Sequence, residues 1–205
     1  MKFYCAPRSI SVATGLLLEE AGLDYEPVLL DFAQNAQRAP EYLAINPKGR
    51  VPALITDQGI LTETGAIAEY IAAQVPDMGL IPQDPWAAAR MRAVCYYLAS
   101  TFHVNHAHRR RGHRWASDEA SLKDMSDNVP RTMGESCAFI EENCALDPFV
   151  MGEAFTIADP WLFTICLWLE GDDVDITSFP RLAAHFDRLA ARPSVAALRG
   201  YDLLT

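Results

Sequence analysis

Cysteine is scarce in this sequence and poorly spaced for metal or redox chemistry. There are five cysteines in 205 residues, an odd number, and no two of them are spaced as C-x-x-C. The usual signatures of a zinc knuckle and of a dithiol redox centre are therefore missing, and we predict no metal. The ordinary interpretation is a set of reduced, mostly buried thiols in a cytoplasmic protein.

Positive charge and long apolar runs are also in short supply. Lysine and arginine total 17 against 27 aspartates and glutamates, which gives a formal charge of −10. This balance repels phosphate backbones and anionic lipid surfaces, so we expect neither a nucleic-acid nor a membrane partner. No apolar run approaches the roughly 20 residues that span a bilayer. The first residues lack the apolar segment of a secretory signal, which also favours the cytoplasm.

Short strand and helix signals alternate over the first third of the chain. We expect strands at 2–5, 25–30, 51–56 and 60–62, and helices at 11–21 (or from Ser9), around 41–43 and from Glu63 onward. A crossover makes the first two strands parallel, and the turn at 57–59 adds an antiparallel hairpin. The order β-α-β-α-β-β-α is that of a thioredoxin-like α/β fold. Pro27 predicts that the second strand lies at a sheet edge.

The remaining sequence contains helical patterns only. Residues 77–86 are rich in proline and lack periodicity, which indicates a linker. Helical patterns then cover 87–110, 118–144, 156–170 and 180–191. We therefore predict an α/β thioredoxin-like domain over 1–76 and an all-α helical bundle over 87–205.

The most informative segment is Asn46-Pro47-Lys48-Gly49-Arg50-Val51-Pro52. A proline at a strand start removes one N–H donor, and a cis Val51–Pro52 bond would turn the backbone sharply. The N–H and C=O of Val51 would then face outward, free to pair with an extended peptide ligand. The alternative is a trans proline at a strand edge.

Glu63 and Thr64 open the helix that follows the hairpin. Exposed N–H groups and the positive end of the helix dipole attract an anion there, and Thr64 adds a hydroxyl. Glu63 can accept from an ammonium group. Together the two residues suit the head group of an α-amino acid, and the alternative is an ordinary helix cap.

These segments occur in an order that resembles the glutathione transferase family. The resemblance is carried by Phe3-Tyr4, Pro7-Arg8-Ser9 and Ser11, by residues 43–54 and 61–67, by the capping box Phe155-Thr156-Ile157-Ala158-Asp159, and by Ala191-Arg192-Pro193-Ser194-Val195. It covers nearly the whole chain and is nearest to bacterial members, including the beta class. The resemblance implies a two-fold homodimer and glutathione as cosubstrate, bound by Lys48, Arg50, Val51, Pro52, Glu63 and Thr64.

The group that activates the thiol is where the sequence departs from the beta class. That class carries a cysteine at the position of Ile10 and a tyrosine at that of Cys5, so a cysteine-type site is not carried over. The Arg8-Ser9 pair resembles the serine-type classes, such as the zeta class. We predict Ser9 as the hydroxyl that hydrogen-bonds the thiolate, with Ser11 second. Cys5 is a third candidate, able to form a mixed disulfide with glutathione. The alternative for Ser11 is a helix cap, and the alternative for Cys5 is a buried core position.

The beta-class lysine that meets the glycyl carboxylate has no counterpart in residues 31–47. The candidates to replace that lysine at the glycyl carboxylate are Gln34, Gln37 and Arg38. Arg50 and Lys48 are weaker candidates. In the second half, His103 matches a beta-class histidine near the thiol, so His103 and Ile10 are expected beside the sulfur or the second substrate. The alternative for His103 is a surface or core histidine with satisfied hydrogen bonds. A basic cluster lies further along the same helix pattern, at Arg109, Arg110, Arg111 and Arg114. It is either a solvated helix end, whose C-terminus favours cations, or a site that attracts an anionic electrophile.

Three functions follow from the resemblance. The first is transfer of glutathione to a hydrophobic or anionic electrophile in a pocket of the helical part, as in detoxification. The second is a glutathione-dependent isomerase of a maleyl-type acid, and the third is a non-catalytic glutathione-binding protein of the stress response.

Overall fold

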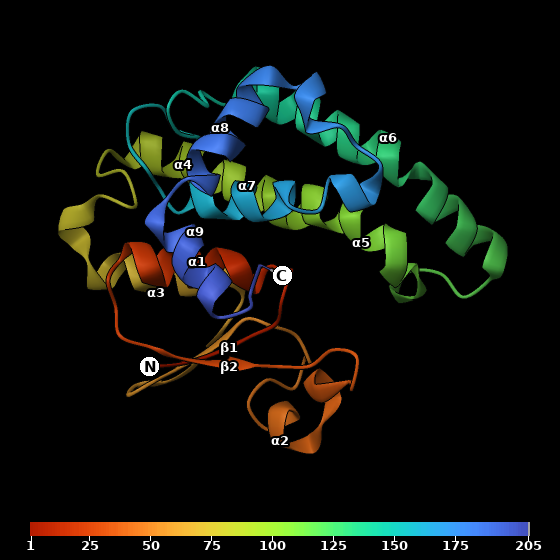
Figure 1. Cartoon of the computed structure of the whole chain (residues 1–205), viewed down its shortest axis with the longest axis horizontal. Coiled ribbons are helices and arrows are strands. Elements are labelled where there is room, and N and C mark those ends of the chain that lie inside the picture. The colour runs from red at the N-terminus through yellow and green to blue at the C-terminus, as the bar shows by residue number, and fades with distance from the viewer. Residues whose placement is uncertain (205) are drawn as a thin grey trace.

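The computed structural model describes residues 1–204, in which a four-stranded sheet adjoins a larger group of helices (Figure 1). The strands are β1 (Lys2–Cys5), β2 (Glu26–Leu29), β3 (Ala53–Thr56) and β4 (Gly59–Thr62), in the spatial order β2-β1-β3-β4. β1 and β2 are parallel, whereas β3 is antiparallel to β1 and β4. The predicted crossover and hairpin are confirmed, and Pro27 lies in an edge strand.

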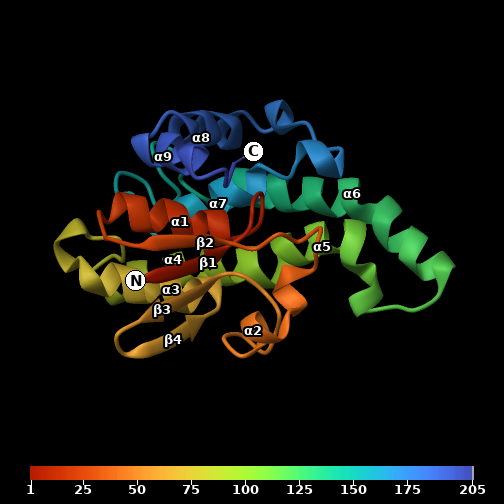
Figure 2. The ribbon, with the colours of Figure 1, turned by 60° about the horizontal axis from the view of Figure 1, so that its bottom comes forward.

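Three helices accompany the sheet and complete what we call the sheet half: α1 (Ser11–Glu20), α2 (Pro40–Leu43) and α3 (Thr64–Gln74). α1 and α3 cover one face of the sheet, and α2 lies on the other side (Figure 2). α1 is buried along residues 11–18 because it also packs against helices of the second half. One core cluster therefore contains Phe3 and Leu17 together with Phe102 and Leu198.

The helical half consists of α4 (Pro85–Tyr97), α5 (His103–Arg111), α6 (Glu119–Asn143), α7 (Ala158–Cys166), α8 (Pro180–Ala190) and α9 (Pro193–Gly200). Within residues 1–204 all strands precede residue 63, so the predicted division into an α/β part and an all-α part is confirmed. None of the helices within residues 1–204 is both long and apolar enough to cross a bilayer.

Two helices differ from the sequence prediction. The helix expected over 87–110 is interrupted by a π-helical turn at Leu98–Phe102. This wider turn rotates the side chains that follow it relative to those of α4, and His103 begins α5 at that point. Helix α9 was not predicted; it begins at Pro193, whose fixed φ suits the first helical position.

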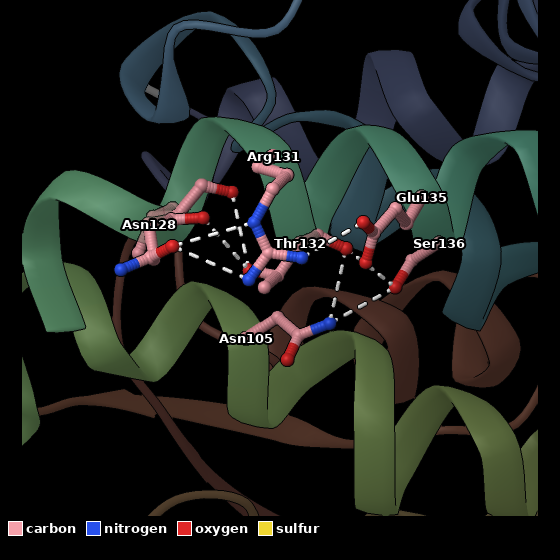
Figure 3. A network of polar contacts seen from close by, with 7 residues as sticks. Asn105, Asn128, Arg131, Thr132, Glu135 and Ser136 are labelled. Atoms are coloured by element: carbon pink, nitrogen blue, oxygen red, sulfur yellow. Dashed lines mark hydrogen bonds and ion pairs between the residues drawn. The ribbon is translucent and has the colours of Figure 1, made fainter.

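Polar contacts fix α5, the helix that carries His103, against α6 (Figure 3). The side-chain amide of Asn105 donates to the carbonyl oxygen of Thr132 (3.1 Å) and to Oγ of Ser136 (3.0 Å). On the outer face of α6, Arg131 pairs with Glu135 at 2.8 Å. The exposed pair adds little stability, whereas the partly buried amide contacts join the two helices.

The capping box at the start of α7 is half as predicted. A carboxylate oxygen of Asp159 accepts from the N–H of Thr156 (2.7 Å), as expected. The N–H of Asp159 donates to the backbone carbonyl oxygen of Thr156 (3.1 Å) rather than to its hydroxyl, and that hydroxyl donates to the Asp159 carboxylate at 3.1 Å.

Candidate functional site

A cavity of about 590 Å³ lies between the two halves. Its sheet-half wall comes from the end of the loop before β3, from the start of α3 and from Ile10, and its other wall comes from α4, α5 and α7. The predicted site residues in its lining are Ile10, Arg50, Val51, Pro52, Glu63, Thr64 and His103. A second cavity of about 690 Å³, at Arg8 and Phe186, contains none of the predicted site residues.

The loop before β3 is held by a buried asparagine. Asn46 is 1% exposed, and its amide donates to the carbonyl oxygen of Arg50 at 2.6 Å. The Tyr42 hydroxyl donates to the same oxygen, also at 2.6 Å. The Val51–Pro52 bond is cis, so the first of the two alternatives left open by the sequence is confirmed. Within residues 1–204 the N–H and C=O of Val51 have no hydrogen-bond partner, so this backbone is free to pair with a ligand.

The start of α3 adds a positive helix end to the same wall. Glu63 has a φ of 73°, which is unfavourable for a residue with a side chain, and Thr64 follows as the first helical residue. No side chain caps this helix end, so its first N–H groups are available to an anion. Lys48 lies outside the cavity lining and pairs with the carboxylate of Glu63, while its Nζ also donates to Oγ1 of Thr62 (2.7 Å).

The predicted thiol-activating groups do not line the cavity. The Ser9 hydroxyl donates to the carbonyl oxygen of Ala6 (2.8 Å) and lies 2.6 Å from Oγ of Ser11. Ser11 is fully buried and accepts from the N–H of Ala6 at 3.0 Å. Both hydroxyls are therefore engaged in the turn that leads into α1. Of residues 9–11 only Ile10 lines the cavity, with the N-terminal end of α1 directly behind it.

Cys5 is buried in the core at the end of β1. Its side chain has no exposed surface, and its Sγ donates to the carbonyl oxygen of Val28 at 3.7 Å. Burial raises the pKa of the Cys5 thiol to about 12, which disfavours the thiolate that a mixed disulfide requires. The geometry therefore supports the core position that the sequence left as the alternative.

His103 lines the opposite wall and is neutral. Burial and then the nearby charge of Arg111 lower its pKa to about 3. Nη2 of Arg111 lies 3.3 Å from Nε2 of His103, and because a guanidinium can only donate, the histidine accepts. The His103 ring also packs on the indole of Trp168, with ring centres 4.9 Å apart.

Some lining residues were not predicted as ligand contacts. They include Asn46, Cys95 and the Glu69–Arg92 pair, in which Arg92 Nε lies 2.7 Å from Glu69 Oε1. Tyr96 and Trp161, whose helical spacing favours a core position, also line the cavity. No group of three or more metal-ligating side chains occurs in the described part of the chain, residues 1–204.

The two halves match known families separately. Residues 1–73 match the family "Glutathione S-transferase, N-terminal domain", and residues 89–193 match "Glutathione S-transferase, C-terminal domain". The chain is 29% identical to glutathione S-transferase GstA of Escherichia coli O157:H7, over 95% of both chains. It is 31% identical to the maleylacetoacetate isomerase of Pseudomonas aeruginosa, over 95% of this chain and 93% of that protein.

A solved structure extends the likeness to the whole backbone. The glutathione transferase homologue from Sulfitobacter, described with bound glutathione, is 50% identical with a TM-score of 0.96. The match covers 99% of this chain and 98% of that one. With both family matches in order along the sequence, the chain belongs to the glutathione S-transferase family.

Proposed function

We propose that this protein is a glutathione transferase that binds the tripeptide in the cavity between its two halves. The observation that carries the proposal is the unpartnered backbone of Val51 beside the uncapped start of α3. An extended peptide pairs with Val51, and its γ-glutamyl head group reaches Thr64 and Glu63. A backbone pair and a charged head group together select a γ-glutamyl peptide over an ordinary one.

The peptide's thiol then points toward Ile10. The positive end of the α1 dipole stabilises a thiolate there, and the thiol proton is released to solvent, because His103, with a pKa of about 3, does not accept it. The thiolate attacks an electrophilic atom of the second substrate, whose leaving group departs with its bonding electrons. Ser9 stays our first candidate for lowering the thiol pKa, followed by Ser11. An unchanged thiolate absorbance titration in Ser9→Ala would reject Ser9.

The glycyl carboxylate lies toward Arg38 and Arg50. The guanidinium of Arg38 rests against Gly49, where an added Cβ would lie 2.9 Å from Nη1, and Arg50 is the next residue. Lys48 is a weaker candidate because Glu63 and Thr62 already engage its ammonium group.

Calorimetric titration with glutathione tests the binding step. It is followed by assays with a chloronitroaromatic compound, a peroxide and a mixed disulfide. Binding with turnover of any of these supports the transferase. Binding without turnover favours the non-catalytic alternative, and no heat with glutathione contradicts the assignment.

The isomerase of a maleyl-type acid is the second candidate function. It is supported by the relative named maleylacetoacetate isomerase, which matches over nearly the full chain. Isomerisation of maleylacetoacetate without net consumption of glutathione would establish it; consumption with a haloaromatic substrate alone would favour transfer.

The protein acts as a cytoplasmic two-fold dimer in this proposal, serving detoxification. Large aromatic side chains are exposed on α4, with Trp86 73% and Tyr96 65% accessible, and Tyr96 also lines the cavity. A two-fold contact over α3 and α4 would cover them and close that end of the cavity. Light scattering at the mass of a single chain, 22.7 kDa, would contradict the dimer.

A further inference from the structure

Four arginines from separate parts of the sequence gather beside the His103 end of the cavity. Arg38 and Arg50 belong to the sheet half, and Arg111 and Arg114 lie at the end of α5 and just beyond it. Burial, and then the charges of Arg50 and Arg38, lower the pKa of Arg114. Burial, then Arg114 and then Arg50, lower the pKa of Arg111 to about 10. The geometry agrees: Arg50 and His103 line the same cavity, Arg111 lies 3.3 Å from His103, and Arg38 rests against Gly49 beside Arg50. The group therefore forms one positive patch on an acidic protein.

No carboxylate neutralises this patch. Within residues 1–204 none of the four arginines forms a salt bridge, whereas Arg109 pairs with Asp173 and Arg192 with Glu20. The one opposing influence on Arg111 comes from Asp172, whose carboxylate is bound to Nδ1 of His106 at 2.7 Å. Arg111 is partly buried, and its contact is a neutral ring nitrogen of His103. A partly buried guanidinium without a counter-charge is an unfavourable arrangement unless an anion binds there.

Glutathione alone leaves most of this charge uncompensated. Its glycyl carboxylate supplies one negative charge, and Arg38 and Arg50 lie on the side of the cavity where that carboxylate is expected. Arg111 instead donates to His103, which lines the opposite wall of the cavity. Under the proposed function, this is the wall that faces the second substrate. A second anion on Arg111 therefore lies on the acceptor side.

We propose that Arg111 and Arg114 bind a carboxylate of the second substrate, so that the enzyme prefers anionic electrophiles to neutral ones. This inference rests on the proposed transferase function. The guanidinium of Arg111 offers paired N–H donors to one carboxylate, which recognises its charge and its planar shape together, and Arg114 adds a second positive charge.

The test compares 4-chloro-3,5-dinitrobenzoate with its neutral carboxamide at saturating glutathione. In both reactions the thiolate sulfur bonds to the ring carbon that carries chlorine, and chloride leaves with the electron pair of the broken carbon–chlorine bond. The ratio of kcat/KM for the acid to kcat/KM for the amide cancels differences in folded fraction and in thiolate formation. We expect Arg111→Gln to lower this ratio about tenfold, since a hydrogen bond to a charged group is lost. Arg111→Lys should retain an intermediate ratio.

The matched control is Arg110→Gln, which removes an exposed charge from the same helix and should leave the ratio within twofold. A ratio unchanged in Arg111→Gln overturns the proposal. So does a rise in the glutathione dissociation constant of Arg111→Gln without a change in the ratio, since Arg111 would then serve the glycyl carboxylate.

A binding measurement separates this inference from the transferase function. Calorimetry on the glutathione-saturated protein compares unreactive 3,5-dinitrobenzoate with 3,5-dinitrobenzamide. Tighter binding of the acid, lost in Arg111→Gln, supports the anion site even if neither chloro compound is turned over. Equal affinity for the two contradicts the site even if both are turned over.

Discussion

The sheet-half wall of the cavity comes mainly from two short runs of consecutive residues, 50–52 and 63–66, whereas the helical wall comes from residues as far apart as Arg92 and Trp161. The first wall offers main-chain groups and a helix end, which suit what every γ-glutamyl peptide shares. The second wall offers side chains only. Under the proposed function, the constant substrate would therefore bind at the first wall and the variable one at the second.

The helical wall should be the more fragile of the two, because it depends on one buried carboxylate. Asp159 accepts from the N–H groups of Val150 and Thr156, each at 2.7 Å, and contacts Nε2 of His185 at 3.0 Å. Asp159→Ala leaves these groups without a partner and should lower the free energy of unfolding by about 3–5 kcal/mol. Urea unfolding followed by circular dichroism measures the loss.

The exposed Asp175, which caps a single turn through Thr177, provides the control for this variant. Asp175→Ala should change the urea midpoint only slightly. Because the two halves share one core, tryptophan fluorescence and circular dichroism should give coincident transitions for Asp159→Ala. A loss of less than about 1 kcal/mol, or a sheet half that unfolds separately, would contradict this account.

The sheet-half wall should instead govern glutathione affinity. Thr64→Val keeps the shape of the side chain but removes the hydroxyl that we propose as a donor to the γ-glutamyl carboxylate. We expect the glutathione dissociation constant to rise about tenfold, measured by calorimetry. Thr56→Val, on the β3–β4 turn, and Tyr96→Phe, on the helical wall, should leave it unchanged. An equal effect from Tyr96→Phe would remove the division of labour between the walls.

How far the sequence predicts this site depends on the wall. The residues of the sheet-half wall follow one another, so a motif identifies Val51, Pro52 and Thr64 directly. His103 and Arg111 lie on a helix that follows a π-helical turn. The hydrophobic periodicity of the sequence does not reveal this turn, so it could not predict which way the two side chains point. Which of Ser9, Ile10 and Ser11 faces the cavity depends on a φ of 51° at Arg8, and the sequence contains no glycine there to indicate it.

The fold was predictable for a related reason. Its strands, hairpin and α3 are specified by local patterns, whereas the buried Asn46 and the short helix α9 depend on tertiary packing. The domain boundaries at 76 and 87 stay predictions, because α1 packs on helices of both halves.

Trp168 joins the helical half to the loop before α1 and should position that loop. Its indole N–H donates to the carbonyl oxygen of Arg8 at 2.8 Å, and the His106 ring stacks on it with centres 4.2 Å apart. Trp168→Phe removes this bond and should lower kcat about fivefold. The glutathione KM should change by less than twofold. Trp115→Phe, an exposed control, should alter neither, and an equal loss in both variants would contradict a positioning role.

The smallest expected effect concerns Lys48, the predicted ligand residue that the structure pairs with Glu63. Both side chains are largely exposed, so Lys48→Met should change the free energy of unfolding by less than about 1 kcal/mol. Its effect on binding should have the opposite sign to that of Thr64→Val. Without the lysine, the Glu63 carboxylate is free for the ligand's ammonium group, and glutathione affinity should rise about twofold at low ionic strength.

Ionic strength distinguishes this competition from direct binding by Lys48. Salt screens exposed pairs, so the gain in Lys48→Met should shrink as salt is raised, whereas the loss in Thr64→Val should persist. Calorimetry of both variants at two salt concentrations makes the comparison. If Lys48→Met binds glutathione more weakly at low salt, Lys48 contacts the peptide directly. Competition between Lys48 and the ligand's ammonium group for Glu63 is then contradicted.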